Sequence, residues 1–112
     1  MDRFSTLVQE HGPERFVVAV TGELDLAQAE QLKGTLEPLL TSGALVVLDA
    51  GAMTFMDSSG LRTLLYAASR AKAEGAVFRL AAALPAVSRV LELSGMVDTL
   101  DARADVPAAL AD

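Results

Sequence analysis

The sequence predicts an α/β domain in which a mixed β-sheet of four to five strands is covered by about four helices. Apolar segments rich in β-branched residues alternate with segments whose apolar residues recur at helical spacing. The run Ala44–Leu48 is short and apolar throughout, which is typical of a strand buried on both faces of a sheet. No repeat, low-complexity segment or linker divides the 112 residues, so we expect a single domain over residues 1–112.

The N-terminal part predicts two strands and a helix. Residues 4–10 form a candidate edge strand, and a turn sequence separates them from the β-rich segment Arg15–Thr21. Strands joined by so short a turn can pair as an antiparallel hairpin. Asp25 then fits the N-cap of a helix, with Gln28 three residues later as in a capping box variant. Pro38 should kink that helix or end it.

The rest of the chain continues the alternation of strand and helix. A central helix is expected from about Ser58 to Ala73, a strand over residues 76–81, and a further helix opened by Pro85. Residues 96–100 are interpreted as a short last strand, and Asp105 begins a small terminal helix. Strands joined through helices favour parallel pairing with right-handed crossovers.

Composition excludes several classes of partner. The formal net charge of −6 disfavours nucleic acid and anionic membrane, which both need a basic surface, and we attribute the charge mainly to solubility. No apolar run approaches membrane-spanning length, and the N-terminus lacks an apolar signal region. The absence of cysteine excludes disulfides and is compatible with a reducing compartment but does not prove one. We expect a cytoplasmic protein.

The sequence also argues against an enzyme. His11 is the only imidazole, and the Gly-x-Ser-x-Gly pattern of hydrolases is absent around Ser58. Neither a phosphate-binding P-loop nor a cluster of His and Cys suited to a metal is present. We therefore expect no catalytic residue, no cofactor and no metal site.

The stretch Met53–Leu61 stands at the junction between the buried strand and the central helix. Asp57, Ser58 and Ser59 each suit a helix start, so two hydroxyls and a carboxylate are displayed on the first turn. Gly60 allows another backbone or a partner to come close. Such a turn can perform chemistry, accept a modification or only cap the helix.

The segment from Ala44 to Leu65 resembles the anti-sigma factor antagonists, the bacterial members of the STAS domain family. Three blocks carry the resemblance: Gly22-Glu23-Leu24-Asp25; Val46-Val47-Leu48-Asp49 with Met53-Thr54-Phe55-Met56-Asp57-Ser58-Ser59-Gly60-Leu61; and Pro85-Ala86-Val87-Ser88-Arg89-Val90-Leu91-Glu92-Leu93-Ser94-Gly95. Their order and spacing cover nearly the whole chain, so a STAS-type fold is implied. One departure, Ala50-Gly51-Ala52, replaces a bulkier residue and a serine that the family more often has, and it lies outside the predicted site.

The resemblance implies a partner-switching mechanism. Unmodified members bind an anti-sigma factor that is also a serine kinase, and thereby free a sigma factor. The kinase phosphorylates a serine in the Asp-Ser-Ser-Gly turn, the antagonist is released, and a phosphatase resets it. The family's acceptor aligns with Ser58, with Ser59 as a minor alternative. The tetrapeptide alone would favour capping, but in the context of all three blocks we favour Ser58 as the acceptor.

Further residues are predicted to contact the partner around the acceptor. Strand ends share one rim of a parallel sheet, which places Asp25 near Asp57. Asp25 therefore either contacts the partner or serves only as an N-cap, and Glu23 is a weaker candidate. Arg62 either meets an acidic partner or is a solvated helix charge. The predicted partner surface consists of Asp25, Asp57, Ser58, Ser59, Gly60 and Arg62.

Apolar residues before the turn leave two interpretations open. Met53, Phe55 and Met56 are suited to a soft binding surface, but core burial is the preferred interpretation for Phe55. A different role for the whole domain also stays open. It could be a STAS scaffold, or an accessory subunit of a signalling or transport complex, in which the turn is never phosphorylated.

Overall fold

The structure is a computed structural model that describes residues 3–111. In chain order its elements are β1 (Ser5–Glu10), β2 (Arg15–Leu24), α1 (Leu26–Leu36), the 3-10 turn η1 (Glu37–Leu39), β3 (Leu45–Met56), α2 (Ser58–Glu74), β4 (Val77–Ala81), α3 (Pro85–Ser94) and α4 (Val106–Leu110). Within the described residues, none of these helices has both the length and the apolar character needed to span a membrane.

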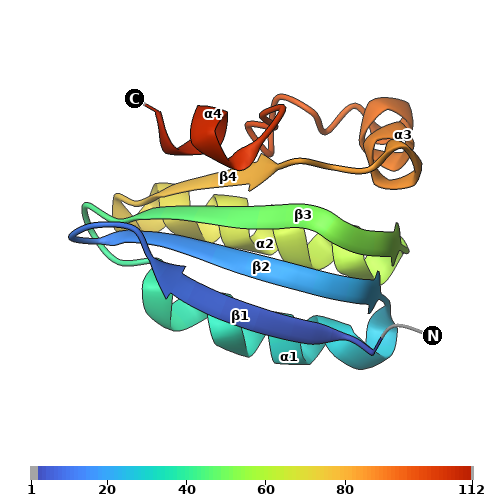
Figure 1. The fold of residues 1–112 in the computed structure, drawn as a ribbon, viewed down its shortest axis with the longest axis horizontal. Helices are drawn as coiled ribbons and strands as arrows, with labels where there is room; N and C mark the ends of the chain where they lie inside the picture. Colours follow the sequence, from blue (N-terminus) through green and yellow to red (C-terminus); the bar gives the residue numbers. More distant parts are fainter. Residues whose placement is uncertain (1–2, 112) are drawn as a thin grey trace.

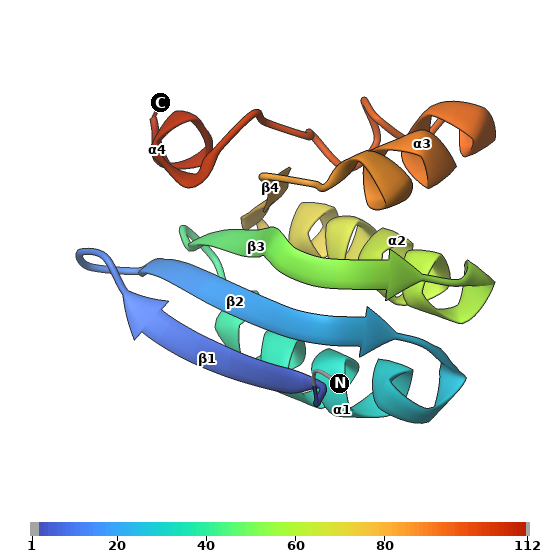
Figure 2. The same ribbon diagram turned by 45° about the vertical axis from the view of Figure 1, so that its right-hand side comes forward.

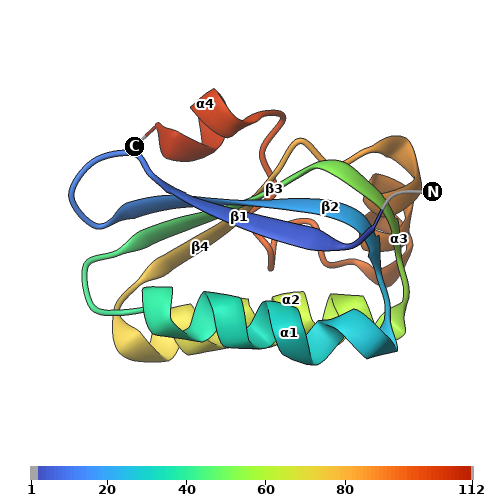
Figure 3. The same cartoon turned by 60° about the horizontal axis from the view of Figure 1, so that its bottom comes forward.

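The strands form one mixed sheet in the order β1-β2-β3-β4 (Figure 1). β1 and β2 pair antiparallel as a hairpin, whereas β2 with β3 and β3 with β4 pair parallel through the helical connections α1 and α2. The predicted mixed α/β fold is therefore confirmed, with four strands and four α-helices between residues 3 and 111. Helices α1 and α2 cover one face of the sheet and the short α4 lies on the other (Figure 3).

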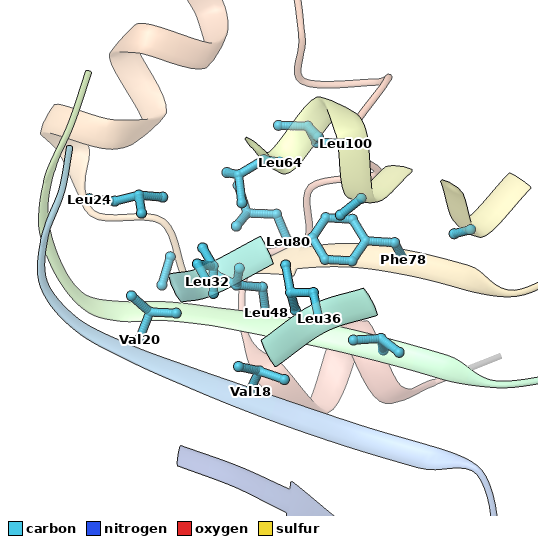
Figure 4. Close-up of a cluster of buried hydrophobic side chains, with 14 of the residues drawn as sticks. Val18, Val20, Leu24, Leu32, Leu36, Leu48, Leu64, Phe78, Leu80 and Leu100 are labelled. Atoms are coloured by element: carbon cyan, nitrogen blue, oxygen red, sulfur yellow. The ribbon is translucent and has the colours of Figure 1, made fainter. Parts of the chain in front are cut away.

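The main core lies between the sheet and the pair α1 and α2. Strands β2, β3 and β4 and both helices contribute fully buried aliphatic side chains to it. These include Val18, Val20, Leu32, Leu36, Leu48, Leu64 and Leu80 (Figure 4). The alternation in β2 explains this arrangement, because Val18 and Val20 point to the helices while Val17 points to the opposite face. The two helices that begin at the rim are thus fixed on a tightly packed support.

A smaller core holds α4 on the opposite face. Ala109 of α4 packs with Val47 of β3 and Ala81 of β4. The guanidinium group of Arg79 donates hydrogen bonds of 2.9 Å to the carbonyl oxygens of Ala109 and Ala111. These bonds satisfy carbonyl groups that the end of a helix leaves without intrahelical partners.

The predicted fifth strand over residues 96–100 is wrong. This segment folds into turns held by local hydrogen bonds, including one of 3.0 Å from the amide of Leu100 to the carbonyl of Met96. Backbone groups that bond within these turns cannot also form the hydrogen bonds of a fifth strand. The chain meets β4 at the end of this segment, where the carbonyl of Leu100 accepts a hydrogen bond from the amide of Leu80, and an isolated bridge between Ala81 and Arg103 follows.

β3 is much longer than the predicted buried strand, and its far end departs from simple alternation. It spans 12 residues, and two register shifts against β2 each place one extra residue on β3. At the second shift Gly22 pairs with Met53 and Glu23 pairs with Phe55, so Thr54 is the extra residue. A bulge of this kind reverses which face the next side chain takes. Phe55 is consequently 47% exposed, and its predicted burial in the core is wrong.

Candidate functional site

β2 and β3 end side by side, and a helix begins directly after each (Figure 2). The last residues of the two strands, Leu24 and Met56, are register partners. Asp25 and Asp57 therefore occupy equivalent places on one rim of the sheet, as the sequence predicted. The amide of Asp57 donates a 3.2 Å hydrogen bond to the carbonyl of Leu24, which ties the two junctions together.

Both aspartates cap the helices that they precede. An Asp25 carboxylate oxygen accepts a hydrogen bond of 3.2 Å from the amide of Gln28, and an Asp57 oxygen accepts one of 3.0 Å from the amide of Gly60. In each case the side chain satisfies an amide that the first turn leaves without an intrahelical partner. The predicted N-cap role of Asp25 is confirmed.

Gly60 is buried where α2 comes closest to the end of β2. A Cβ atom at this position would lie 2.7 Å from the carbonyl oxygen of Leu24 and 2.8 Å from side-chain carbons of Leu24 and Met56. The close approach predicted for this glycine is thus made by the chain's own strand. It sets the first turn of α2 firmly against the rim.

Ser58 and Ser59 follow the cap and have no role in capping. Ser58 is the first residue of α2 and is exposed, while Ser59 is half-buried. Within residues 3–111 neither hydroxyl takes part in a hydrogen bond, although the Ser59 carbonyl accepts one of 3.2 Å from the hydroxyl of buried Thr63. The Ser58 hydroxyl is therefore free to face a partner, beside the positive end of the helix dipole.

Arg62 lies one turn further along α2, where α1 and α2 face each other. Its side chain lines a shallow groove of about 160 Å³ together with Lys33 of α1 and Tyr66 of α2. The ammonium group of Lys33 lies 4.3 Å from the centre of the Tyr66 ring, and the Tyr66 hydroxyl donates a 3.0 Å hydrogen bond to Glu37. In the described part of the chain no carboxylate pairs with Arg62. Its charge is available at the edge of the rim.

Two large apolar side chains are exposed at this rim: Leu26, which the sequence did not single out, and Phe55, for which a binding surface was the less favoured interpretation. Leu26 is the first residue of α1 and is 73% exposed, and Phe55 is the penultimate residue of β3. No clear sequence signal marks Leu26 as exposed, because it stands three residues before buried Ala29 and so shares the spacing of the buried face of α1. The exposure of Phe55 depends on the bulge at Thr54, which leaves no clear mark in the sequence.

The other residues near the rim that the sequence offered as partner contacts differ in their exposure to solvent. Glu23 is exposed and lies opposite Phe55 on the neighbouring strand. Met53 and Met56 are buried in the main core, which leaves Phe55 as the exposed member of that apolar group. Among the residues searched, no group of three or more His, Cys, Asp or Glu side chains is arranged to hold a metal ion.

Comparison with known proteins places these features in a family. The family model described as "Mlab, STAS domain" matches residues 7–101. An anti-sigma factor antagonist from Mycobacterium paratuberculosis shares 28% sequence identity, with a TM-score of 0.84 over 96% of this chain and 92% of that one. The unphosphorylated form of the anti-sigma factor antagonist SpoIIAA shares 24% identity, with a TM-score of 0.75 over 89% of each chain.

A protein of a different family role has the same fold. A sulfate transporter family protein from Wolinella succinogenes is 16% identical, with a TM-score of 0.75 over 91% of this chain and 86% of that one. The mixed sheet, the capped helix at its rim and the family-model match over residues 7–101 all indicate a STAS domain. The resemblance seen in the sequence is confirmed, and the chain belongs to the STAS domain family.

Proposed function

We propose that this protein is an anti-sigma factor antagonist that is switched by phosphorylation of Ser58. The observation that carries the proposal is the free, exposed Ser58 hydroxyl on a helix already capped by Asp57. The similarity to an anti-sigma factor antagonist of 28% identity supports the same class of partner. In its unmodified form the protein binds an anti-sigma factor that is a serine kinase, and a sigma factor is freed.

The switch itself is a phosphoryl transfer carried out by the partner. The Ser58 oxygen attacks the γ-phosphorus of ATP bound to the kinase, the bond to ADP breaks, and a base of the kinase takes the hydroxyl proton. A phosphatase restores the hydroxyl by hydrolysis and releases inorganic phosphate. All reacting groups other than Ser58 belong to the partners, so this chain is a substrate and a binding protein rather than an enzyme.

Charge explains why modification would end binding without unfolding the domain. Phosphorylation adds about −1.5 to −2 charges at neutral pH to a chain of net charge −6. At the exposed helix start the dipole favours the dianion by about 0.3–1 kcal/mol, and repulsion from Asp57 opposes this in screened solvent. Inside a partner interface the same charge is desolvated, which costs several kcal/mol unless it is paired.

The partner surface extends from Ser58 over the rim. We assign to it Asp25, Asp57, Ser59 and Arg62, which follow the two strand ends or lie one helical turn beyond them. Leu26 and Phe55 add exposed apolar area beside these polar groups. Gly60 contributes by holding the turn in place. A kinase and sigma factor of the transcription machinery imply that the protein works in the cytoplasm.

Identification of the modified hydroxyl tests the proposal. The kinase would first be captured from native cytoplasm on the immobilised protein and then supplied with ATP. We expect mass spectrometry to find phosphate on Ser58, Ser58→Ala to remain unmodified while still binding, and Ser59→Ala to be modified at least in part. Phosphate on Ser59 with Ser58 unmodified would reverse the assignment.

A second function is supported by one observation, the shared fold with a sulfate transporter family protein. In that case the domain would be an accessory subunit of a transport complex, or a scaffold in a signalling assembly, and Ser58 would not be phosphorylated. The same capture experiment separates the two functions. Recovery of transporter subunits, with no kinase among the bound proteins, would favour the accessory role.

A further inference from the structure

The two edge strands of the sheet differ in whether another segment of the chain pairs with their outer side. At the β4 edge the chain itself pairs with the strand: the amide of Leu80 donates to the carbonyl of Leu100 at 3.2 Å, and the amide of Arg103 donates to the carbonyl of Leu80 at 2.8 Å. β1 forms the opposite edge and pairs only with β2 among the described residues. The outward-facing backbone groups of β1 are left to solvent or to another strand.

β1 carries little of the usual protection of an edge strand. Natural edges are blunted by proline, lysine, a bulge or a short length. β1 has six residues in unbroken register with β2, it contains neither proline nor lysine, and its one charge is Glu10 at the end. At its centre Leu7 is 58% exposed and Val8 is 42% exposed. The strand thus combines unpaired backbone groups with two large exposed apolar side chains.

We propose that β1 pairs antiparallel with β1 of a second copy, joining the two four-stranded sheets into one. A two-fold axis perpendicular to the sheet keeps α1 and α2 of both copies on the same face. It therefore requires that residues opposite each other across the axis belong to the same face. Pairing Leu7 with its own symmetry mate meets this condition.

That register is self-complementary along the strand. With Leu7 on the axis, Thr6 lies opposite Val8 and Ser5 lies opposite Gln9, all of them uncharged. Glu10 falls opposite Phe4, so no carboxylate meets another. Leu7 pairs with Ala19 of β2, and both point away from the face that α1 and α2 cover. The two Leu7 side chains would therefore bury each other on the open face of the joined sheet.

A second copy fits this edge better than an unrelated strand because the pairing closes on itself. An isologous two-fold contact uses each edge once and cannot extend into a filament. It also leaves the proposed switch site uncovered, since β1 is separated from the β3 end by β2. The antiparallel arrangement directs the two Ser58-bearing rims to opposite ends of the joined sheet, so that both remain accessible to partners.

Size and charge set the strength of this dimer. An interface of one six-residue strand a side lies at the small end of specific contacts, so we expect a dissociation constant on the order of 100 µM. Each copy has a net charge of −6, which opposes association at low salt. Association should therefore strengthen when salt is raised, in contrast to a contact held by opposite charges.

Sedimentation velocity of the full chain from about 10 to about 500 µM tests the proposal. We expect the wild type to shift from monomer toward dimer, more so at high salt, and Leu7→Lys to remain monomeric because it sets two cations face to face. Leu93→Lys on α3 is the matched control, since Leu93 is 78% exposed and far from the axis, and it should dimerise like the wild type. Circular dichroism checks that each variant is folded.

Several results would overturn the proposal. These are a wild type that stays monomeric throughout, growth beyond the dimer, or association that Leu93→Lys abolishes and Leu7→Lys retains. Hydrogen exchange adds a readout at the strand itself. The amides of residues 5–10 should be more protected at high concentration than at low concentration, and unchanged protection would contradict the pairing.

Discussion

The helices α1 and α2 start at the same rim in nearly the same way, yet they present different surfaces there. Each follows a strand end, and each is capped by an aspartate that accepts from the amide three residues later. The first residue of α1 is the apolar Leu26, whereas the first residue of α2 is Ser58. At the third position α1 has Gln28 and α2 has the buried Gly60.

The comparison shows which features a helix start needs and which it does not. α1 begins without a serine, so the aspartate is sufficient for capping at this rim. The hydroxyl of Ser58 is additional to that requirement, and a modification of it leaves the cap in place. Gly60 adds the other difference, because it lets α2 lie closer to β2 than a side chain would allow.

The largest effect is expected from Gly60→Ala. Its methyl group would overlap the carbonyl oxygen of Leu24, and the strain outweighs the gain in helix propensity. We expect a loss of about 2 kcal/mol in the free energy of unfolding and a fall of about 8 °C in melting temperature. Gly34→Ala in α1 is the control, since its Cβ would meet nothing within 4 Å, and it should gain up to about 1 kcal/mol. Equal effects of the two changes would contradict the tight packing of α2.

Removal of the caps should have the next largest effect and should be alike at the two junctions. Asp25→Ala and Asp57→Ala each lose one side-chain hydrogen bond to an amide, so each should cost about 1 kcal/mol in urea unfolding. Ser58→Ala should change stability by less than about 0.5 kcal/mol. If Ser58→Ala were as costly as Asp57→Ala, the serine would belong to the cap after all.

The apolar residues of the rim should affect partner binding without affecting stability. Leu26→Ala and Phe55→Ala each remove exposed apolar area beside Ser58, and we expect each to weaken kinase binding by about threefold to tenfold. The melting temperature should stay within about 2 °C of the wild type. Titration calorimetry with the captured kinase measures the affinity, and Leu93→Ala on α3 provides an exposed leucine outside the rim. Loss of binding by Leu93→Ala alone would place the partner surface elsewhere.

Asp101 offers a further contrast with the capping aspartates because its carboxylate binds side chains. Burial raises the pKa of Asp101, but hydrogen bonds of 3.0 Å from the guanidinium groups of Arg103 and Arg79, with their charges, lower it overall below its ordinary value of 3.8. A lowered folded pKa stabilises the fold above the unfolded value, and this contribution is lost as pH falls through the folded pKa. The carboxylate is 41% exposed, so we expect the smallest effect of the series here.

Urea unfolding at several pH values measures the contribution of the Asp101 carboxylate to the free energy of unfolding. The stability difference between wild type and Asp101→Asn should be greatest near neutral pH and should shrink as the solution is acidified below about pH 4. A difference that stays constant down to about pH 2 would show that the ion pairs are not its source.

Most of the architecture could be predicted because local signals agreed with it. The short turn before Arg15 gave the hairpin, and the spacing of Asp25 and Gln28 gave the start of α1. Pro38 falls in the 3-10 turn that ends the first helix, as expected for a residue without an amide hydrogen. The same signals brought Asp25 and Asp57 to one rim.

The wrong predictions concern segments in which the pattern of apolar side chains does not determine the backbone conformation. Phe55 follows an extra residue in β3, and a bulge of that kind is decided by pairing with β2 rather than by the residue itself. Residues 96–100 have an apolar content like that of a strand, but local hydrogen bonds close them into turns. Leu100 is buried in the core even though it lies in a turn and not in a strand. Leu26 was overlooked because alternation and helical periodicity point to buried residues, not to exposed ones.

The most direct test of the central claim is the affinity of the captured kinase for three forms of the protein: unmodified, phosphorylated on Ser58, and Ser58→Asp. We predict that phosphorylation weakens binding by about a hundredfold or more and that Ser58→Asp, with one charge, weakens it by at least about tenfold. Circular dichroism and melting temperature should remain close to those of the unmodified protein. Equal affinities for the three forms would contradict a charge switch at the rim, and so would a loss of binding that occurs only because the domain unfolds.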